Sequence, residues 1–310
     1  LISRDQRVAY ATEDVKRHQA TEGDEMNSQV ECRLESFIVA LGFLAALGLL
    51  QACEPGESQA SDSWVLVWED EFESPRLDGA SWNIVHMPDP FNEELQYYPD
   101  RPDNSPNANV LIEDGILIIE ARREDYEHRM YTSARINTKG KREFLYGRFE
   151  ARMRLPAEVG MWPAFWMLGG NIDEVGWPAC GEIDIMEGKG RLPSWTSGAL
   201  HRGPDPASNI ITAAEYELPE GDFHNEWHVF AVDWEPEQIR WYVDDALFQT
   251  VDKPAAVEPA YWPFDTGQSF FLILNLAVGG WFDTPHLPPE DLQPQRLLVD
   301  YVRAYRRAAP

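Results

Sequence analysis

One short segment, Gly181-Glu182-Ile183-Asp184-Ile185-Met186-Glu187-Gly188, sets acidic side chains against apolar ones. Alternation at period two predicts a β-strand with one buried face and one face toward water or a ligand. On a regular strand Glu182 and Asp184 share a face, whereas Glu187 points to the other. A β-bulge at Ile185-Met186 adds one residue and brings all three carboxylates to one side. Because bulges occur next to active sites, we take this strand as the candidate functional site.

Three carboxylates on one face repel each other and would weaken a strand that had only a structural role. The same repulsion raises the pKa of at least one carboxyl and keeps a proton available near neutral pH. A retaining glycosidase needs an ionised and a protonated carboxyl ~5–5.5 Å apart. Strand parity alone would leave Glu182 and Glu187 roughly 13 Å apart, so the bulge, strand twist and long side chains must bring them together. A solvated acidic edge strand and a calcium loop are the alternatives, but Ile183, Ile185 and Met186 require a core.

This strand resembles the active-site strand of glycoside hydrolase family 16, in the longer form that contains the extra residue. That form is typical of laminarinase-like β-1,3-glucanases and also of agarases and carrageenases, and the resemblance runs from about residue 65 to residue 305. It implies that Glu182 is the nucleophile, that Asp184 assists it and that Glu187 is the general acid/base. We expect Glu187 to have the higher pKa of the pair, and we expect catalysis to need no cofactor.

The resemblance also predicts a set of substrate-binding side chains. They are Asn92, Glu94, Arg152, Trp166, Trp177, His201, Asn275 and Trp281. Indole faces stack on sugar rings, although Trp166 and Trp177 taken alone are more often core residues. His201 matches a family histidine near the acid/base glutamate, and its alternative is a core histidine with a satisfied hydrogen bond. Asn275 lies on an otherwise apolar strand, where an unpaired amide would be costly, so a position facing the substrate explains it.

The chain is expected to be an all-β protein. Its 310 residues include 23 Pro, 21 Gly and 12 Trp, which favours a loop-rich β-protein over a helical one. Strands are expected at residues 64–68, 109–112, 116–122, 146–155, 163–168, 183–187, 197–201, 227–234, 238–243, 270–277 and 297–305. Many short strands separated by turn residues, such as Asp114-Gly115, predict two packed antiparallel sheets. The family resemblance makes this β-sandwich a jelly roll with a concave substrate cleft.

The charge of the chain excludes some partners. A formal net charge of -27 argues against nucleic acid, because its phosphates would be repelled. The same charge suits a secreted enzyme acting on a neutral sugar polymer and is less favourable for a heavily sulfated one. We expect the partner to be a β-glucan polysaccharide, and we expect the enzyme to be a monomer.

The N-terminal residues are expected to be a targeting segment. Residues 37–50 form an uncharged apolar run of fourteen, too short to span a bilayer comfortably but suited to a signal peptide. The run ends in Leu50-Gln51-Ala52-Cys53, which resembles a bacterial lipobox whose cysteine carries lipid. We expect residues 1–25 to be a non-native upstream extension, 26–52 a lipoprotein signal peptide, 53–63 a tether and 64–310 the catalytic domain. Lipid on Cys53 would anchor the enzyme to a bacterial membrane, outside the cytoplasm.

The resemblance further suggests a structural calcium ion on the convex side. Glu71, Asp300 and the backbone carbonyl of Gly115 match positions where many family members bind calcium. Hard oxygen ligands from three distant segments suit this ion. The alternative is that Asp300 only forms a surface ion pair with Arg303 or Arg306.

These features lead to an endo-β-1,3-glucanase acting on laminarin or on mixed-linked β-1,3-1,4-glucan with retention. An agarase or carrageenase is the alternative within the same chemistry. A non-catalytic glucan-binding protein is the alternative from another class. Glu182 and Glu187 are both present, which favours an enzyme over a binding protein that has lost them.

Overall fold

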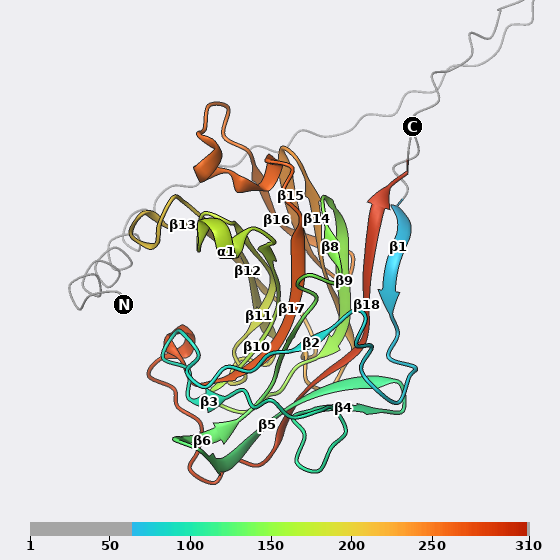
Figure 1. Ribbon diagram of the computed structural model, residues 1–310, viewed down its shortest axis with the longest axis vertical. Helices are drawn as coiled ribbons and strands as arrows, with labels where there is room; N and C mark the ends of the chain where they lie inside the picture. The colour runs from blue at the N-terminus through green and yellow to red at the C-terminus, as the bar shows by residue number, and fades with distance from the viewer. Residues whose placement is uncertain (1–63, 309–310) are drawn as a thin grey trace, which may run out of the picture. The chain divides into compact units, whose positions relative to one another are not determined.

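Alternation of apolar and polar side chains along the strands builds two β-sheets around a shared core. The structure is a computed structural model that describes residues 64–308 (Figure 1). The expected upstream extension, signal peptide, tether and Cys53 lie outside the described residues. The two sheets form a jelly-roll sandwich, as expected, and their strands curl (Figure 1).

The ten-stranded sheet has the order β16-β15-β14-β9-β18-β5-β6-β3, with β1 beside β18 and β4 beside β5. Its strands are β1 (Trp64–Asp70), β3 (Gln96–Tyr97), β4 (Val110–Glu113), β5 (Ile116–Tyr126), β6 (Arg129–Thr132), β9 (Gly147–Arg154), β14 (His228–Glu235), β15 (Gln238–Val243), β16 (Ala246–Asp252) and β18 (Gln295–Arg307). Its pairings are antiparallel except for that of β3 with β6.

The eight-stranded sheet has the order β13-β12-β11-β10-β17-β7-β2, with β8 beside β17. Its strands are β2 (Asn83–Ile84), β7 (Arg135–Asn137), β8 (Glu143–Phe144), β10 (Met161–Gly169), β11 (Glu182–Gly188), β12 (Trp195–Arg202), β13 (Ile210–Glu217) and β17 (Phe270–Val278). It carries the three carboxylates of the candidate site on β11. We call the face of this sheet that is turned away from the core the catalytic face.

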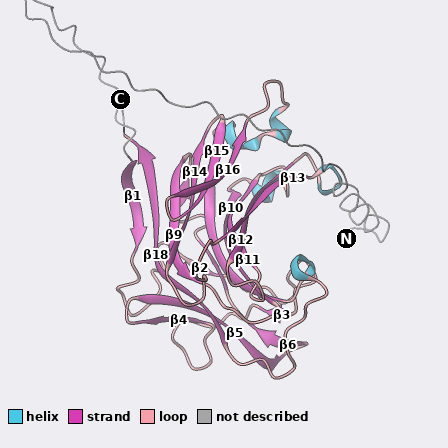
Figure 2. Cartoon of the chain, turned by 180° about the vertical axis from the view of Figure 1, so that it is seen from behind, coloured by secondary structure: helices cyan, strands magenta, loops and turns pink. Residues whose placement is uncertain are grey.

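Helices occur only in the connections between the described strands (Figure 2). They are α1 (Ile172–Val175) and the 3-10 helices η2 (Pro206–Ser208), η3 (Pro259–Tyr261), η4 (Pro263–Asp265) and η5 (Trp281–Asp283). None of these helices, within residues 64–308, is long and apolar enough to cross a lipid bilayer.

The core lies between the two sheets and follows the predicted strand parity. On β9, Phe149 and Met153 are fully buried in it, whereas Arg148 lies on the opposite face. On β17, Leu272 and Leu274 enter the same core from the other sheet. Burying large apolar side chains of this kind contributes about 1.5–3 kcal/mol each. The shared core therefore fixes which face of each strand is left for chemistry.

The bulge in β11 is confirmed. Asp184 pairs with Ala199 and Glu187 pairs with Ser197, so β11 has one residue more than β12 between these pairs. The extra residue belongs to Ile185-Met186, and both of these side chains are buried in the core. Two consecutive inward side chains restore the parity, and the three carboxylates consequently share the catalytic face.

Candidate active site

Each of the two glutamates of the catalytic strand is held by an indole. Trp177, in the connection between α1 and β11, donates from Nε1 to Glu182 Oε2 at 3.0 Å. Trp162, on the neighbouring strand β10, donates from Nε1 to Glu187 Oε1 at 3.0 Å. Each hydrogen bond favours the ionised form of its carboxyl. The indoles orient the two carboxyls and partly offset the cost of burying them.

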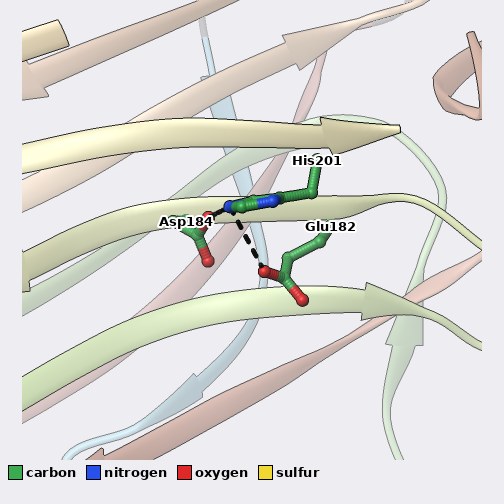
Figure 3. A group of neighbouring side chains, drawn as sticks. All are labelled: Glu182, Asp184 and His201. Atoms are coloured by element: carbon green, nitrogen blue, oxygen red, sulfur yellow. Dashed lines mark ion pairs between the residues drawn. The ribbon is translucent and has the colours of Figure 1, made fainter. Parts of the chain in front are cut away.

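His201 lies between the nucleophile candidate and its neighbour (Figure 3). It is directly opposite Glu182 in the pairing of β11 with β12. Its Nε2 is 3.4 Å from Asp184 Oδ2 and 3.7 Å from Glu182 Oε1. Burial lowers the pKa of His201 to about 4, so the imidazole is neutral at neutral pH. The three residues therefore form a close polar group, and the neutral His201 adds no positive charge to it.

Burial raises the pKa of all three carboxyls. The pKa of Glu182 rises to about 8, through burial first and then through repulsion from Glu187. The pKa of Glu187 rises to about 7, with the positive charge of Lys189 partly opposing the effect of burial. The pKa of Asp184 is raised well above its ordinary value by burial and by both glutamates. The site consequently retains protons near neutral pH, as an acid catalyst requires.

The expectation that Glu187 has the higher pKa of the pair stays a prediction, because burial raises the pKa of both glutamates. The repulsion between Glu182 and Glu187 disfavours ionising both at once, and the ammonium of Lys189 partly opposes the rise at Glu187. Since the two carboxyls interact, each protonation step belongs to the pair rather than to one residue. The assignment of Glu187 as the acid therefore rests on its position in the family motif.

The loop that precedes β3 brings Asn92 and Glu94 beside the end of β17. The amide of Gln96 donates to Glu94 Oε2 at 2.5 Å, and its carbonyl accepts from the backbone of Val278 at 2.8 Å. The backbone carbonyl of Asn92 accepts from the backbone N–H of Trp281 at 2.9 Å. These bonds connect two of the predicted substrate-binding segments. Trp281 keeps 51% of its surface exposed, so its indole is available for a sugar ring.

Trp166 and Asn275 meet on the catalytic face. Trp166 Nε1 donates to Asn275 Oδ1 at 2.7 Å, which satisfies the amide on the apolar strand β17. Asn275 Nδ2 lies 3.5 Å from the hydroxyl of Tyr98. Tyr98 in turn donates to Glu94 Oε2 at 3.2 Å. A chain of hydrogen bonds thus connects the loop of Glu94 to the strand beside the catalytic carboxylates.

Arg135 is a residue of the site that the sequence analysis did not predict. It pairs with Asn275 across β7 and β17, and its guanidinium lies 4.5 Å from the centre of the Trp166 ring. Its positive charge lowers the pKa values of Glu94 and Glu182 against the larger effect of burial. The sequence feature that could have predicted this position is alternation. Arg135 stands between the apolar residues Ala134 and Ile136, so it is expected on the face opposite to theirs.

Arg152 was expected to bind substrate, and the structure places it elsewhere. Strand parity places it on β9 of the ten-stranded sheet, on the side opposite the buried Ala151 and Met153. Its Nη1 donates to Asp300 Oδ2 at 2.5 Å, and its guanidinium lies 5.2 Å from the centre of the Trp227 ring. It therefore does not lie with the substrate-binding candidates around β11.

The residues expected to bind calcium do not fit that ion. Arg303 donates to both carboxylate oxygens of Glu71, at 2.7 and 3.0 Å. Asp300 pairs with Arg152, rather than with Arg303 or Arg306 as the alternative had it. Gly115 belongs to the positive-φ turn between β4 and β5. A divalent cation needs oxygens that are free to coordinate it, and arginines already neutralise these two carboxylates.

Comparison with known proteins agrees with this geometry. The sequence profile described as glycosyl hydrolases family 16 matches residues 104–286. A beta-glucanase of Rhodothermus marinus is 41% identical over 273 residues, 84% of this chain and 92% of the relative. A glucan endo-1,3-beta-glucosidase of Cryptopygus antarcticus is 40% identical over 240 residues, 72% of this chain and 83% of the relative. The X-ray structure of the laminarinase from Rhodothermus marinus, 41% identical, matches with a TM-score of 0.72 and covers 80% of this chain and 99% of that one.

The profile covers more than half of the chain, and it includes the bulged strand with its three carboxylates. The strand, its indole donors and the jelly-roll sandwich are consistent with hydrolysis of a glycosidic bond by two carboxyl groups. The chain belongs to glycosyl hydrolases family 16 and is a glycoside hydrolase.

Proposed function

We propose that this enzyme is a retaining endo-hydrolase of β-1,3-glucan of the laminarin type, or of mixed-linked β-1,3-1,4-glucan. The observation that carries the proposal is the bulge that sets Glu182, Asp184 and Glu187 on one face of β11. The choice of β-1,3-glucan is supported by relatives named beta-glucanase and glucan endo-1,3-beta-glucosidase and by a matching laminarinase structure.

The first step of the reaction forms a covalent glycosyl-enzyme. The ionised carboxylate of Glu182 attacks the anomeric carbon, and the carboxylic acid of Glu187 gives its proton to the glycosidic oxygen as the bond to that oxygen breaks. The shortened chain with a new hydroxyl then leaves. Binding strength along the sugar chain comes from stacking on exposed indoles such as Trp281 and from polar side chains such as Asn92 and Glu94.

The second step releases the sugar with its original configuration. Glu187, now a carboxylate, takes a proton from water, and the resulting hydroxide displaces Glu182 from the anomeric carbon. Two inversions at one carbon give net retention. Asp184 lies between the two glutamates in sequence and beside Glu182 in space. Burial and the charges of both glutamates raise the pKa of its carboxyl, so its protonation depends on theirs.

A substrate panel tests the proposal. We expect reducing ends to appear rapidly from laminarin, more slowly from lichenan, and at background level from agarose and carrageenan. Proton NMR at early times should show the β-anomer of the new reducing end, since two inversions retain the configuration. Preferential hydrolysis of agarose or carrageenan would support the galactan alternative. Binding of laminarin without release of reducing ends would support the non-catalytic alternative.

We also propose that the enzyme acts as a monomer and reaches the outside of the cytoplasm as a lipoprotein anchored through Cys53. The support is the apolar run at residues 37–50, the lipobox-like segment that ends at Cys53 and the polar residues that follow. No calcium is part of the proposal, because Glu71 and Asp300 pair with arginines.

Replacing Cys53 with serine should move the protein from the membrane fraction to the soluble fraction when it is expressed in a bacterium with lipoprotein processing. The reason is that a single thiol carries the lipid, and the lipid supplies the membrane affinity. Metabolic labelling with a fatty-acid analogue should label the parent chain and not the variant. Cys180→Ser serves as the control, because its buried thiol lies in the catalytic domain. A Cys53→Ser protein that stays in the membrane fraction would refute the anchor.

A further inference from the structure

His201 has a third polar neighbour, on the side of its ring away from the carboxylates. Asn209 Nδ2 lies 3.1 Å from His201 Nδ1. Asn209 comes from the connection between β12 and β13, directly after η2. In that connection the side chain of Asp205 accepts from the backbone N–H of Ser208 at 2.9 Å. The turn is thereby fixed next to the catalytic face, and it holds the Asn209 amide against the imidazole.

The orientation of this amide decides where the imidazole carries its proton. In a neutral imidazole one nitrogen donates and the other accepts. An Asn209 N–H that donates to Nδ1 requires the lone pair to be on Nδ1, so the ring proton is on Nε2. Nε2 is the nitrogen that faces Asp184 Oδ2 at 3.4 Å and Glu182 Oε1 at 3.7 Å. The amide therefore controls a hydrogen-bond donor aimed at the catalytic carboxyls.

Asp184 offers this donor an acceptor that lacks a hydrogen bond. Its Oδ2 is buried, and no well-aligned hydrogen bond reaches it among the described residues. A buried carboxylate oxygen without a donor is costly. His201 Nε2 lies 3.4 Å from that oxygen, and a small movement of the ring would align an Nε2–H with it. In the other tautomer the Nε2 lone pair would face both oxygens and would repel them whenever the carboxyls are ionised.

We infer that Asn209 is a positioning residue that holds neutral His201 as the Nε2–H tautomer, so that the imidazole donates toward Asp184 and Glu182. Asn209 acts through His201 and is assigned no contact with the substrate. The inference deepens the proposed glycosidase function and rests on it for its kinetic consequences. The tautomer itself can be measured without any substrate.

The surroundings of His201 set the sign of the expected pH effect. Glu182 and Asp184 face it from β11, Ile211 pairs with it from β13, and the Trp177 ring centre lies 5.8 Å from its own. Glu182 and Asp184 are the titratable groups among these neighbours. Each carboxyl ionises most easily when His201 Nε2 donates a hydrogen bond to it. Losing the Nε2–H would raise the pKa of Glu182. Because Glu182 must be ionised to attack, the acidic limb of the activity profile would move to higher pH.

The first test is NMR of the full chain labelled with 15N-histidine, at neutral pH and without substrate. Long-range 15N–1H correlations distinguish the two tautomers, and the His201 signals are identified by their loss in His201→Gln. We expect the Nε2–H tautomer in the parent and a mixture of both tautomers in Asn209→Leu. A parent enzyme with the proton on Nδ1, or an Asn209→Leu variant that keeps the parental tautomer, would overturn the inference.

The second test is kinetic and separates positioning from folding. We expect Asn209→Leu to lower kcat about tenfold, the equivalent of one pK unit, with KM nearly unchanged and the acidic limb moved to higher pH. Asn209→Gln, which keeps an amide donor, should recover part of the loss. Asn225→Leu is the matched control, because Asn225 is an exposed loop residue whose amide donates to Asp222. An Asn209→Leu enzyme with parental melting temperature, kcat and acidic limb would contradict the role.

The two tests fail differently if the proposed function is wrong. A chain that does not hydrolyse any of the tested glucans would invalidate the kinetic arm but would leave the tautomer measurement intact. An active glucanase with the Nδ1–H tautomer would remove the role of Asn209 and leave the function standing.

Discussion

Glu182→Gln is expected to lower turnover on laminarin by roughly 10⁴-fold, since it removes the nucleophile of a group of residues that act as a unit. The fold should survive the change. A glutamine carbonyl can still accept from Trp177 Nε1, as Glu182 does at 3.0 Å. The substitution also removes a buried carboxyl that repels Glu187. The melting temperature should consequently stay close to that of the parent, which circular dichroism can check.

Chemical rescue identifies the role of Glu182 more directly. In Glu182→Ala, azide can occupy the vacated space and attack the anomeric carbon of an aryl glycoside that has a good leaving group. One displacement instead of two gives a glycosyl azide of inverted configuration. Glu174→Gln is the matched control, because Glu174 is exposed on α1, and it should retain parental activity. Near-parental turnover in Glu182→Gln would refute the double-displacement mechanism.

The bulge shows how far the sequence alone can lead. The parity of Glu182, Asp184 and Glu187 requires one extra inward residue, and Ile185-Met186 supplies it. This inference needs only local information, because a strand with a core on one side fixes the face of every residue. The buried faces of β9 and β17 follow from the same rule. The shared face of the three carboxylates was therefore predictable, as were the longer strands with clear alternation. The expected set had no counterpart for β2, β3, β6, β7, β8, β13 and β16.

Contacts between distant strands were not predictable in this way. Arg135 reaches the site because β7 pairs with β17, which places it opposite Asn275 across 140 residues of sequence. Arg152 was misassigned for the related reason that parity tells the face of a strand but not which sheet contains it. The pairing of Asp300 with Arg152 likewise depends on the alignment of β18 with β9. Long-range register decides all three positions.

The pKa values of the carboxyls in the site also depend on three-dimensional contacts. The sequence indicates that three close carboxyls must have raised pKa values. It does not indicate that Lys189 lies near enough to Glu187 to oppose that rise, or that Glu187 adds to the shift of Glu182. It likewise gives no signal that Asn209 lies against His201, because that contact depends on the turn after η2.

Glu187→Ala is expected to change both limbs of the pH profile, in a direction that the structure fixes. For the parent we expect a bell-shaped dependence of kcat/KM, because the pair must keep one of its two protons. Burial raises the pKa of both glutamates, so we expect the singly protonated pair near neutral pH. Loss of the acid should lower turnover of laminarin by roughly 10²–10⁴-fold, the usual contribution of general acid–base catalysis.

An aryl glycoside with a good leaving group separates the two roles of Glu187. Such a leaving group needs no proton, so the alkaline limb should disappear in Glu187→Ala. The acidic limb should move to lower pH, because the repulsion of Glu187 is one of the causes that raise the pKa of Glu182. Glu187→Gln should behave similarly while it keeps the hydrogen bond from Trp162. Persistence of the alkaline limb in both variants would assign the acid to another residue, and Asp184 would be the next candidate.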